Sequence, residues 1–175
     1  MVTDAADLKL PPHNLEAEEA VLGSLLIDDE AVDKVVGTLK AADFYREKNR
    51  WVYEACLELH KRREPINTIT VAYELKRRQV LEALGGAAYL SHLVAQTPTS
   101  VHVAHYGAIV ERLSMYRRMI QAANRIAAIA YEEPTDPAGA LARAREALEQ
   151  VHGGNGSATK YSGGYQTISG WVDIR

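Results

Sequence analysis

The feature that most constrains the fold is a stretch of 31 residues, 101–131, that contains no proline and one glycine, Gly107. As a helix it would span roughly 46 Å, more than a compact domain needs. Its apolar residues form two stripes with alternating spacings of three and four. The first stripe comprises Tyr106, Ile109, Leu113, Tyr116, Ile120, Ala123, Ala127 and Ala130, and the second comprises Met115, Met119, Ala122, Ile126 and Ile129. A helix with two apolar stripes requires two neighbours.

One of those neighbours is expected to be the next segment, which begins at Pro137 and ends at Val151. It carries a heptad pattern at Leu141, Ala144, Leu148 and Val151. Such a segment can fold back as the short arm of a helical hairpin and cover one stripe. The other stripe is left for the rest of the chain or for a second copy, so the pattern indicates an assembly module.

The residues before the hairpin predict a helical head. Asn14 is placed to cap a first helix that ends near Ile27, and Glu16, Glu18 and Glu19 suit the positive end of its dipole. A short helix is expected at 28–36, followed by helices at 46–62, 68–79 and 87–95, and Phe44 is expected to fill the core. Asn67 or Thr68 would cap the fourth of these helices, and Ser100 or Thr99 the long one. No segment shows the alternation of a strand.

The predicted fold class is therefore all-α, with a head of about five helices and a hairpin of one long and one short helix. The expected divisions are a flexible arm at 1–13, the head at 14–100, the hairpin at 101–152 and a tail at 153–175. Half of the twelve glycines lie in that tail, which is typical of a linker. It is either a linker or a truncated or foreign end.

Composition places the chain among ordinary globular proteins, with 47% apolar and 25% charged residues. The net charge of −3 argues against tight, sequence-blind nucleic-acid binding, which requires a dense positive surface. One cysteine, Cys56, excludes an internal disulfide and suits a reducing compartment. No signal peptide or membrane-length apolar run is present, so a cytoplasmic protein without membrane contact is expected.

The motifs of catalysis are absent from the sequence. No glycine is followed by lysine, which excludes a phosphate-binding loop, and neither H-E-x-x-H nor C-x-x-C occurs. His102 and His105 could share a helix face as metal ligands of a small hydrolase, but no third ligand lies beside them. The acidic run at 28–33 is explained by a helix start, and Cys56 by burial on an apolar face. We therefore expect no catalytic, cofactor-binding or metal residues.

Three pairs of arginines stand out: Arg62-Arg63, Arg77-Arg78 and Arg117-Arg118. The first two pairs lie at helix ends, where they complement the dipole. Arg118, in mid-helix, would meet either an acidic partner or water. The helix at 68–79 has its basic residues near its end, whereas recognition helices usually read bases from their first turns. A stand-alone nucleic-acid-binding regulator remains the alternative, and steeply salt-dependent DNA binding would favour it.

Five blocks of sequence, in order, resemble the N-terminal domain of the bacterial replicative DNA helicase, the DnaB-like family. They are PPHNLEAEEAVLGSLLID, ADFYREKNRWVYEA, EPINTITVAYELKRR, LGGAAYLSHLVAQTPTS and HYGAIVERLSMYRRMIQAANRIAAIAYEE. Together they lie within about Pro11 to Val151.

The resemblance implies a collar domain acting in DNA replication at the bacterial fork. In the family this domain pairs and assembles, from dimers to a hexameric ring, and supports a motor that uses ATP and Mg²⁺ to move along DNA. It also docks the primase and can meet helicase loaders. The motor motifs are missing here and the residues after His152 depart from the family, so this chain alone is not expected to hydrolyse ATP.

The resemblance also suggests which residues bind partners. Tyr89, Ile120 and Ile126 correspond to the family's primase-contacting positions. Combined with the second apolar stripe and the mid-helix arginine, the predicted partner-binding set is Tyr89, Met115, Arg118, Met119, Ile120, Ile126 and Ile129. On this basis an aspartate at position 126 should weaken partner binding while the head stays folded.

Overall fold

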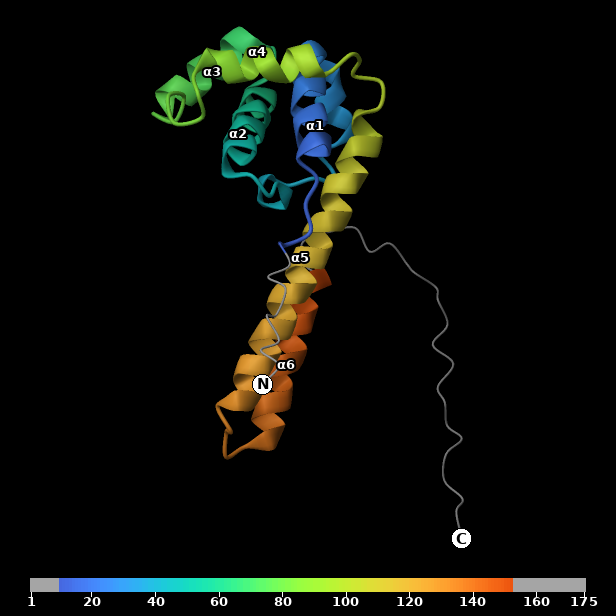
Figure 1. Ribbon diagram of the computed structural model, residues 1–175, viewed down its shortest axis with the longest axis vertical. Coiled ribbons are helices and arrows are strands. Elements are labelled where there is room, and N and C mark those ends of the chain that lie inside the picture. Colours follow the sequence, from blue (N-terminus) through green and yellow to red (C-terminus); the bar gives the residue numbers. More distant parts are fainter. Residues whose placement is uncertain (1–9, 153–175) are drawn as a thin grey trace, which may run out of the picture.

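The computed structural model describes residues 10–152, and every regular element within them is helical (Figure 1). The elements are α1 (Leu15–Ile27), η1 (Asp29–Lys34), η2 (Ala41–Asp43), α2 (Glu47–Arg62), α3 (Thr68–Arg77), α4 (Ala87–Gln96), α5 (Val103–Tyr131) and α6 (Pro137–His152). The all-α prediction is confirmed. The expectations for residues 1–9 and for the tail at 153–175 fall outside the described residues.

Helix α1 lies at the centre of the head, packed against α2, α4 and α5. Its residues 21–26 are all buried, as expected of a helix segment that neighbours surround, and Val21, Leu22 and Leu25 are completely buried. Gly23 lets α4 approach closely, because a Cβ there would lie 2.0 Å from the hydroxyl oxygen of Thr97. Phe44 is fully buried in the same core, as predicted.

Helix starts follow the predicted caps in two cases and not in a third. The Asn14 side chain accepts a hydrogen bond from the Ala17 amide at 2.9 Å, and Asn67 accepts from the amides of Ile69 and Thr70. Helix α5 has no side-chain cap. Ser100 instead donates its hydroxyl to Asp28 at 2.8 Å, which ties the loop before α5 to the start of η1. The predicted Ser100 or Thr99 cap is therefore wrong.

Glu18 has a role in addition to the one predicted. Its carboxylate is buried and accepts hydrogen bonds from the backbone amides of Tyr45 at 2.6 Å and Arg46 at 3.3 Å. It also accepts one from the side-chain amide of Asn49 at 2.8 Å. Glu18 thus satisfies the amides of the two residues that precede α2, a helix that has no side-chain cap of its own. It also lies in the first turn of α1, as predicted.

Three of the four arginines at the ends of α2 and α3 also have specific partners. Arg62, Arg77 and Arg78 all donate to the carboxylate of Glu74, at 2.8–3.0 Å, and Glu74 is buried. Arg62 and Arg77 lie in the last turns of their helices, as predicted, and they also hold this carboxylate. The cluster joins α2 to α3 around one negative charge.

Helices α5 and α6 form an antiparallel hairpin that extends away from the head (Figure 1). The first half of α5 packs on α1 and η2, while α6 packs along its second half. No helix within residues 10–152 combines the length and apolar content of a membrane span.

Candidate protein-docking surface

The side chains of α5 divide into those that contact the head, those that contact α6 and those that are exposed. Near the start of the helix, Val103, Gly107, Val110 and Ser114 are buried against the head. Beyond it, Ala122 and Ile129 are buried and Ile126 is half-buried, one or two turns apart on the side that faces α6. The short arm of the hairpin therefore covers the last three residues of the second predicted stripe, whereas its first two, Met115 and Met119, stay exposed.

Helix α6 faces α5 through its small residues. Ala147 and Val151 are buried and Ala140 and Ala144 are half-buried, at the same three- and four-residue spacing. Leu141 and Leu148 are 62% and 53% exposed. The prediction that Leu141 and Leu148 face α5 is thus wrong. The neighbouring residues Ala140 and Ala147 face α5 in their place, so the helix packs mainly through alanine.

Two polar contacts close one flank of the hairpin. Arg125 of α5 donates to Gln150 of α6 at 2.5 Å, and Arg143 of α6 pairs with Glu132 at 3.0 Å. Successive helical residues turn by about 100°. Leu141 and Leu148 therefore lie on the opposite flank of α6 from Arg143 and Gln150.

On α5, the corresponding flank carries the first stripe from Tyr116 onward, together with Met115 and Met119 of the second stripe. Met119 is 51% exposed and Ile120 46% exposed, and Met115 and Tyr116 are exposed beside them. Exposed alanines continue the surface toward the tip of the hairpin. We call this surface the open apolar face, and it consists of Met115, Tyr116, Met119, Ile120, Ala123, Ala127, Ala130, Leu141 and Leu148.

The open apolar face crosses both helices of a rod that the head does not cover. Single exposed apolar residues are ordinary, whereas a continuous apolar surface marks a site where another molecule binds. Methionine, with its flexible side chain, is common at such surfaces. The arrangement can bind a helix or another apolar surface; no acid–base or nucleophilic group is part of it.

The predicted partner-binding residues are divided by the structure. Met115, Met119 and Ile120 lie on the open apolar face. Ile126 and Ile129 are turned toward α6, within the hairpin itself. An aspartate at Ile126 would therefore disturb the hairpin directly, and a role of these two isoleucines in partner binding stays an untested prediction.

Arg118 belongs to a polar contact where the hairpin leaves the head, which we call the neck. Its guanidinium pairs with the buried Asp43 at 2.8 Å, and Ser114 donates to the same carboxylate at 2.6 Å. The neighbouring Arg117 donates to the carbonyl oxygens of Asp43 and Pro12. Burial lowers the pKa of Arg117. The structure thus gives both arginines partners within the chain.

Tyr89 lies in the head, away from the open apolar face. It is buried, its hydroxyl donates to Asn49, and the Lys48 ammonium lies 3.6 Å above its ring. Burial raises the pKa of Tyr89 to about 12, so the phenol is neutral. Through Asn49 it joins the Glu18 network that holds α1, α2 and α4 together. Direct contact between Tyr89 and a partner stays a prediction.

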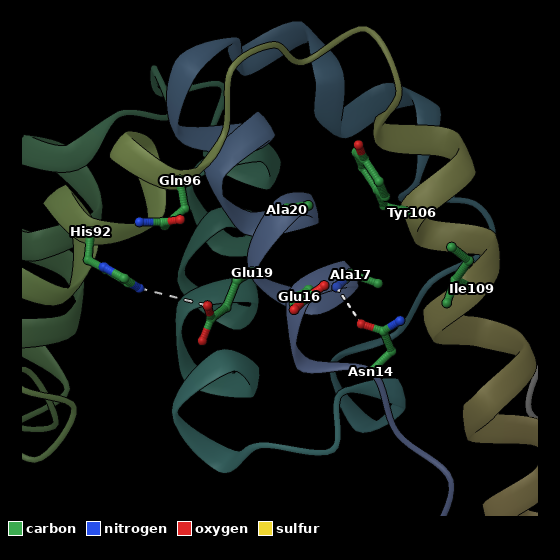
Figure 2. Close-up of a pocket in the computed structure, with 9 residues that line it drawn as sticks. All are labelled: Asn14, Glu16, Ala17, Glu19, Ala20, His92, Gln96, Tyr106 and Ile109. Atoms are coloured by element: carbon green, nitrogen blue, oxygen red, sulfur yellow. Dashed lines mark hydrogen bonds and ion pairs between the residues drawn. The ribbon is translucent and has the colours of Figure 1, made fainter.

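A groove of about 500 Å³ lies beside this network, between α1, α4 and α5. Figure 2 shows Glu16 and Glu19 on α1, His92 and Gln96 on α4, and Tyr106 on α5 around it. His92 lies 3.8 Å from Glu19, which also pairs with Arg46 at 2.7 Å. The groove has both polar and apolar lining residues and is separate from the open apolar face.

The residues considered as metal ligands or as a nucleophile do not form such sites among the described residues. His102 and His105 are exposed, and the described residues contain no group of three or more His, Cys, Asp or Glu arranged to hold a metal. Within the acidic run, Asp28 accepts from the Glu30 amide at 3.2 Å and so caps η1. Burial raises the pKa of the Cys56 thiol to about 12, which suits a core side chain and not a nucleophile.

Comparison with known proteins places the chain in a family. The family model described as the DnaB-like helicase N terminal domain matches residues 10–112, more than half of the chain. The chain belongs to this family. The match runs from the segment before α1 through the whole head and into the first third of α5.

The curated relatives of this DnaB-like domain are replicative helicases. It is 38% identical over 143 residues to the replicative DNA helicase DnaB of Mycobacterium leprae, covering 81% of this chain and 24% of that protein. It is 35% identical over 150 residues to the replicative DNA helicase DnaC of Bacillus subtilis, covering 86% of this chain and 33% of that protein. The chain thus spans about a quarter to a third of these relatives.

Solved structures agree with the DnaB-like assignment. The crystal structure of the N-terminal domain of DnaB helicase from Mycobacterium tuberculosis matches with a TM-score of 0.78 and 37% identity, covering 81% of this chain and 99% of that one. A DnaB-like replicative helicase, solved to show its interactions with primase, matches with a TM-score of 0.66. It is 22% identical and covers 79% of this chain and 31% of that one, so it shows the shared fold alone.

Proposed function

We propose that this DnaB-like N-terminal domain is the collar of a replicative helicase, assembling copies of the chain into a ring and docking the primase. The observation that carries the proposal is the open apolar face, which spans both helices of the hairpin and is not covered by the head. A second copy presenting the same face would bury both surfaces. Apolar anchors at the centre with polar residues around them are the usual form of such an interface.

Primase is the second proposed partner. The 22%-identical relative with the same fold is described with its interactions with primase. The exposed Ile120 also lies at a position that the family resemblance links to primase. A helical segment of the primase laid along the open apolar face would use the groove-and-helix contact common in protein recognition.

Self-association is tested by sedimentation velocity on the whole chain over a range of concentrations. We expect the parent chain to associate as its concentration rises and the double variant Met119→Asp, Ile120→Asp to remain monomeric. Burying an unpaired carboxylate in an apolar interface is costly. The matched control is Gln121→Asp, which adds a charge at an exposed position on a different side of the same turn. A parent chain that stays monomeric at high concentration contradicts the assembly role.

Primase docking is tested separately by isothermal titration calorimetry with the cognate primase. We expect binding to the parent chain and to Gln121→Asp, and weaker binding to the double variant. Equal primase affinity in the parent and the double variant would show that the open apolar face is not the primase-docking site. That result would not contradict the proposal of self-association.

A further inference from the structure

Helix α3 presents a pair of large apolar side chains to solvent. Ile69 is 79% exposed and Tyr73 is 73% exposed, more than any other large apolar residue in the helices of the head. Residues three and four apart share one side of a helix, so the exposed Lys76 continues the same side. We call these three residues the α3 outer face. Tyrosine is enriched at the centres of protein interfaces, which makes this side of α3 a candidate contact.

The groove between α1, α4 and α5 is a concave surface with a small-residue base. Ala17 and Ala20 of α1 form that base, Ile109 of α5 lines one wall, and Glu16 lies at one end (Figure 2). Its volume of about 500 Å³ is ordinary for a site that takes up the side chains of another molecule. An apolar side chain with a neighbouring cation matches this lining.

Each of the two surfaces carries one charge without an ion-pair partner, and the two charges are opposite. Within residues 10–152, neither Lys76 nor Glu16 forms an ion pair. Glu19 of the groove already pairs with Arg46, and Arg77 beside the α3 outer face already pairs with a buried carboxylate. The complementarity between the surfaces therefore consists of one cation and one carboxylate beside apolar groups.

The spacing of these groups also agrees. Tyr73 and Lys76 are three residues apart on α3, about 4.5 Å along the helix, and Ala20 and Glu16 are four residues apart on α1, about 6 Å. If α3 lies antiparallel to α1, the tyrosine ring covers Ala20 while the lysine ammonium reaches Glu16. The flexible four-carbon stem of lysine spans the remaining difference.

The two surfaces belong to different parts of the head, so they can meet only between two copies of the chain. Helix α3 packs on α2 and α4, on the other side of the head from α5, and it does not line the groove (Figure 1). A contact between two different surfaces runs head to tail and continues from copy to copy until a ring closes. The open apolar face, when paired with itself, stops at two copies. A ring therefore requires a second interface of the head-to-tail kind.

We propose that Tyr73 of one copy inserts into the groove between α1, α4 and α5 of a second copy, with Lys76 paired to Glu16, and that this contact joins hairpin-paired dimers into a ring. The proposal rests on the assembly role proposed above, to which it adds a second interface. The contact is small and therefore weak by itself. It becomes effective when paired hairpins already hold the heads at high local concentration.

The test is an NMR mixing experiment on full chains that carry Met119→Asp and Ile120→Asp, which prevent pairing through the open apolar face. A ¹⁵N-labelled chain with Tyr73→Ser keeps the groove and loses its own tyrosine. Adding an unlabelled chain that retains Tyr73 should shift the amides of residues 16–20, 92–96 and 106–109 and leave those of 69–77 unchanged. Adding unlabelled Tyr73→Ser at the same concentration should weaken the binding roughly ten-fold or more.

Charge reversal tests the pairing of Lys76 with Glu16. Glu16→Lys on the labelled chain should weaken the binding roughly five-fold, because an exposed ion pair is replaced by two like charges. Unlabelled Lys76→Glu should restore it to within about two-fold of the starting affinity, since the reversed pair is again complementary.

The controls match each variant in residue type and exposure. Tyr131→Ser in the unlabelled chain removes a tyrosine that is 87% exposed at the tip of the hairpin. Glu47→Lys in the labelled chain reverses another exposed glutamate in the first turn of a helix. Both should bind like their parents, and thermal unfolding should show that every variant stays folded.

Three results would overturn the proposal: groove amides that do not shift, shifts that are equal with and without Tyr73, or a charge reversal that is not rescued. None of them would contradict pairing through the open apolar face, which sedimentation of the parent chain measures independently.

Discussion

Glu74 is a single carboxylate about which the contact between α2 and α3 is organised. The hydrogen bond from Arg77, supported by those from Arg78 and Arg62, holds its pKa at about 2 against the opposing effect of burial. A carboxyl group with a lowered folded-state pKa stabilises the fold above its unfolded-state pKa. That stabilisation is lost as the pH falls toward 2.

We expect Glu74→Gln to reduce the free energy of unfolding by about 2 kcal/mol at neutral pH, allowing for solvent screening of the partly exposed arginines. Urea unfolding at pH 7 and at steps from pH 5 down to pH 2 measures it. The gap between parent and variant should narrow over the acidic range, because the parent's own Glu74 becomes protonated there. Glu54→Gln, which changes a more exposed partner of Arg78, should have a much smaller effect.

Gly23 sets the distance between α1 and α4. An alanine Cβ at this position would meet the Thr97 hydroxyl at 2.0 Å and the Leu93 carbonyl oxygen at 2.4 Å, and that carbonyl is backbone and cannot swing aside. We expect Gly23→Ala to lower stability by about 1–3 kcal/mol through overpacking. Gly37→Ala is the control, since nothing lies within 4 Å of its Cβ position. The midpoints of urea denaturation compare the two, and equal midpoints would contradict the close approach.

At the scale of the elements, the hairpin depends on the small contact between Ile126, Ile129 and the alanine side of α6. Ile129→Asp places a charge in that contact, where removing it from water is costly. We expect amide hydrogen exchange to accelerate throughout α6 while the amides of α1 and α2 stay protected. Ala128→Asp, at an exposed position one residue away, should leave α6 protected.

The order of the helices could be predicted from the sequence because its signals are local. Asn14, Asn67 and Pro137 mark helix starts by their own chemistry, and the long proline-free stretch with its two stripes indicates a hairpin. Which stripe α6 covers could not be predicted. Both stripes are apolar, and the choice depends on alanine packing that a heptad pattern led by Leu141 and Leu148 conceals.

The hydrogen-bond partners of the buried charged residues also could not be predicted from neighbouring sequence. Glu18 and the main-chain amides it accepts from are 27 and 28 residues apart, and Asp43 and Arg118 are 75 residues apart. In the sequence each of these residues resembles an ordinary surface charge. Their burial is decided by which helices the fold brings together, and one sequence contains no sign of that pairing.

For the molecule as a whole, the neck fixes the direction of the rod relative to the head. Asp43 of η2 receives hydrogen bonds from Ser114 and Arg118 of α5 and from the Lys40 amide. Removing one member of a buried, hydrogen-bonded charge pair leaves the other without compensation. We expect Arg118→Ala to broaden the distribution of distances between spin labels on the head and on the hairpin tip, measured by electron–electron resonance. Arg112→Ala, an exposed arginine on the same helix, should leave that distribution narrow.

The part of α5 that extends beyond the head, from Arg118 to Tyr131, can tilt about the neck. At about 1.5 Å per residue it is roughly 20 Å long, so a tilt of about 10° displaces its end by roughly 3 Å. That displacement is close to a full atomic diameter, enough to shift one set of side chains out of the gaps between another. If two copies of the hairpin packed through Met115 and Met119, the fit between their side chains would therefore depend on the hydrogen bonds that Asp43 accepts at the neck.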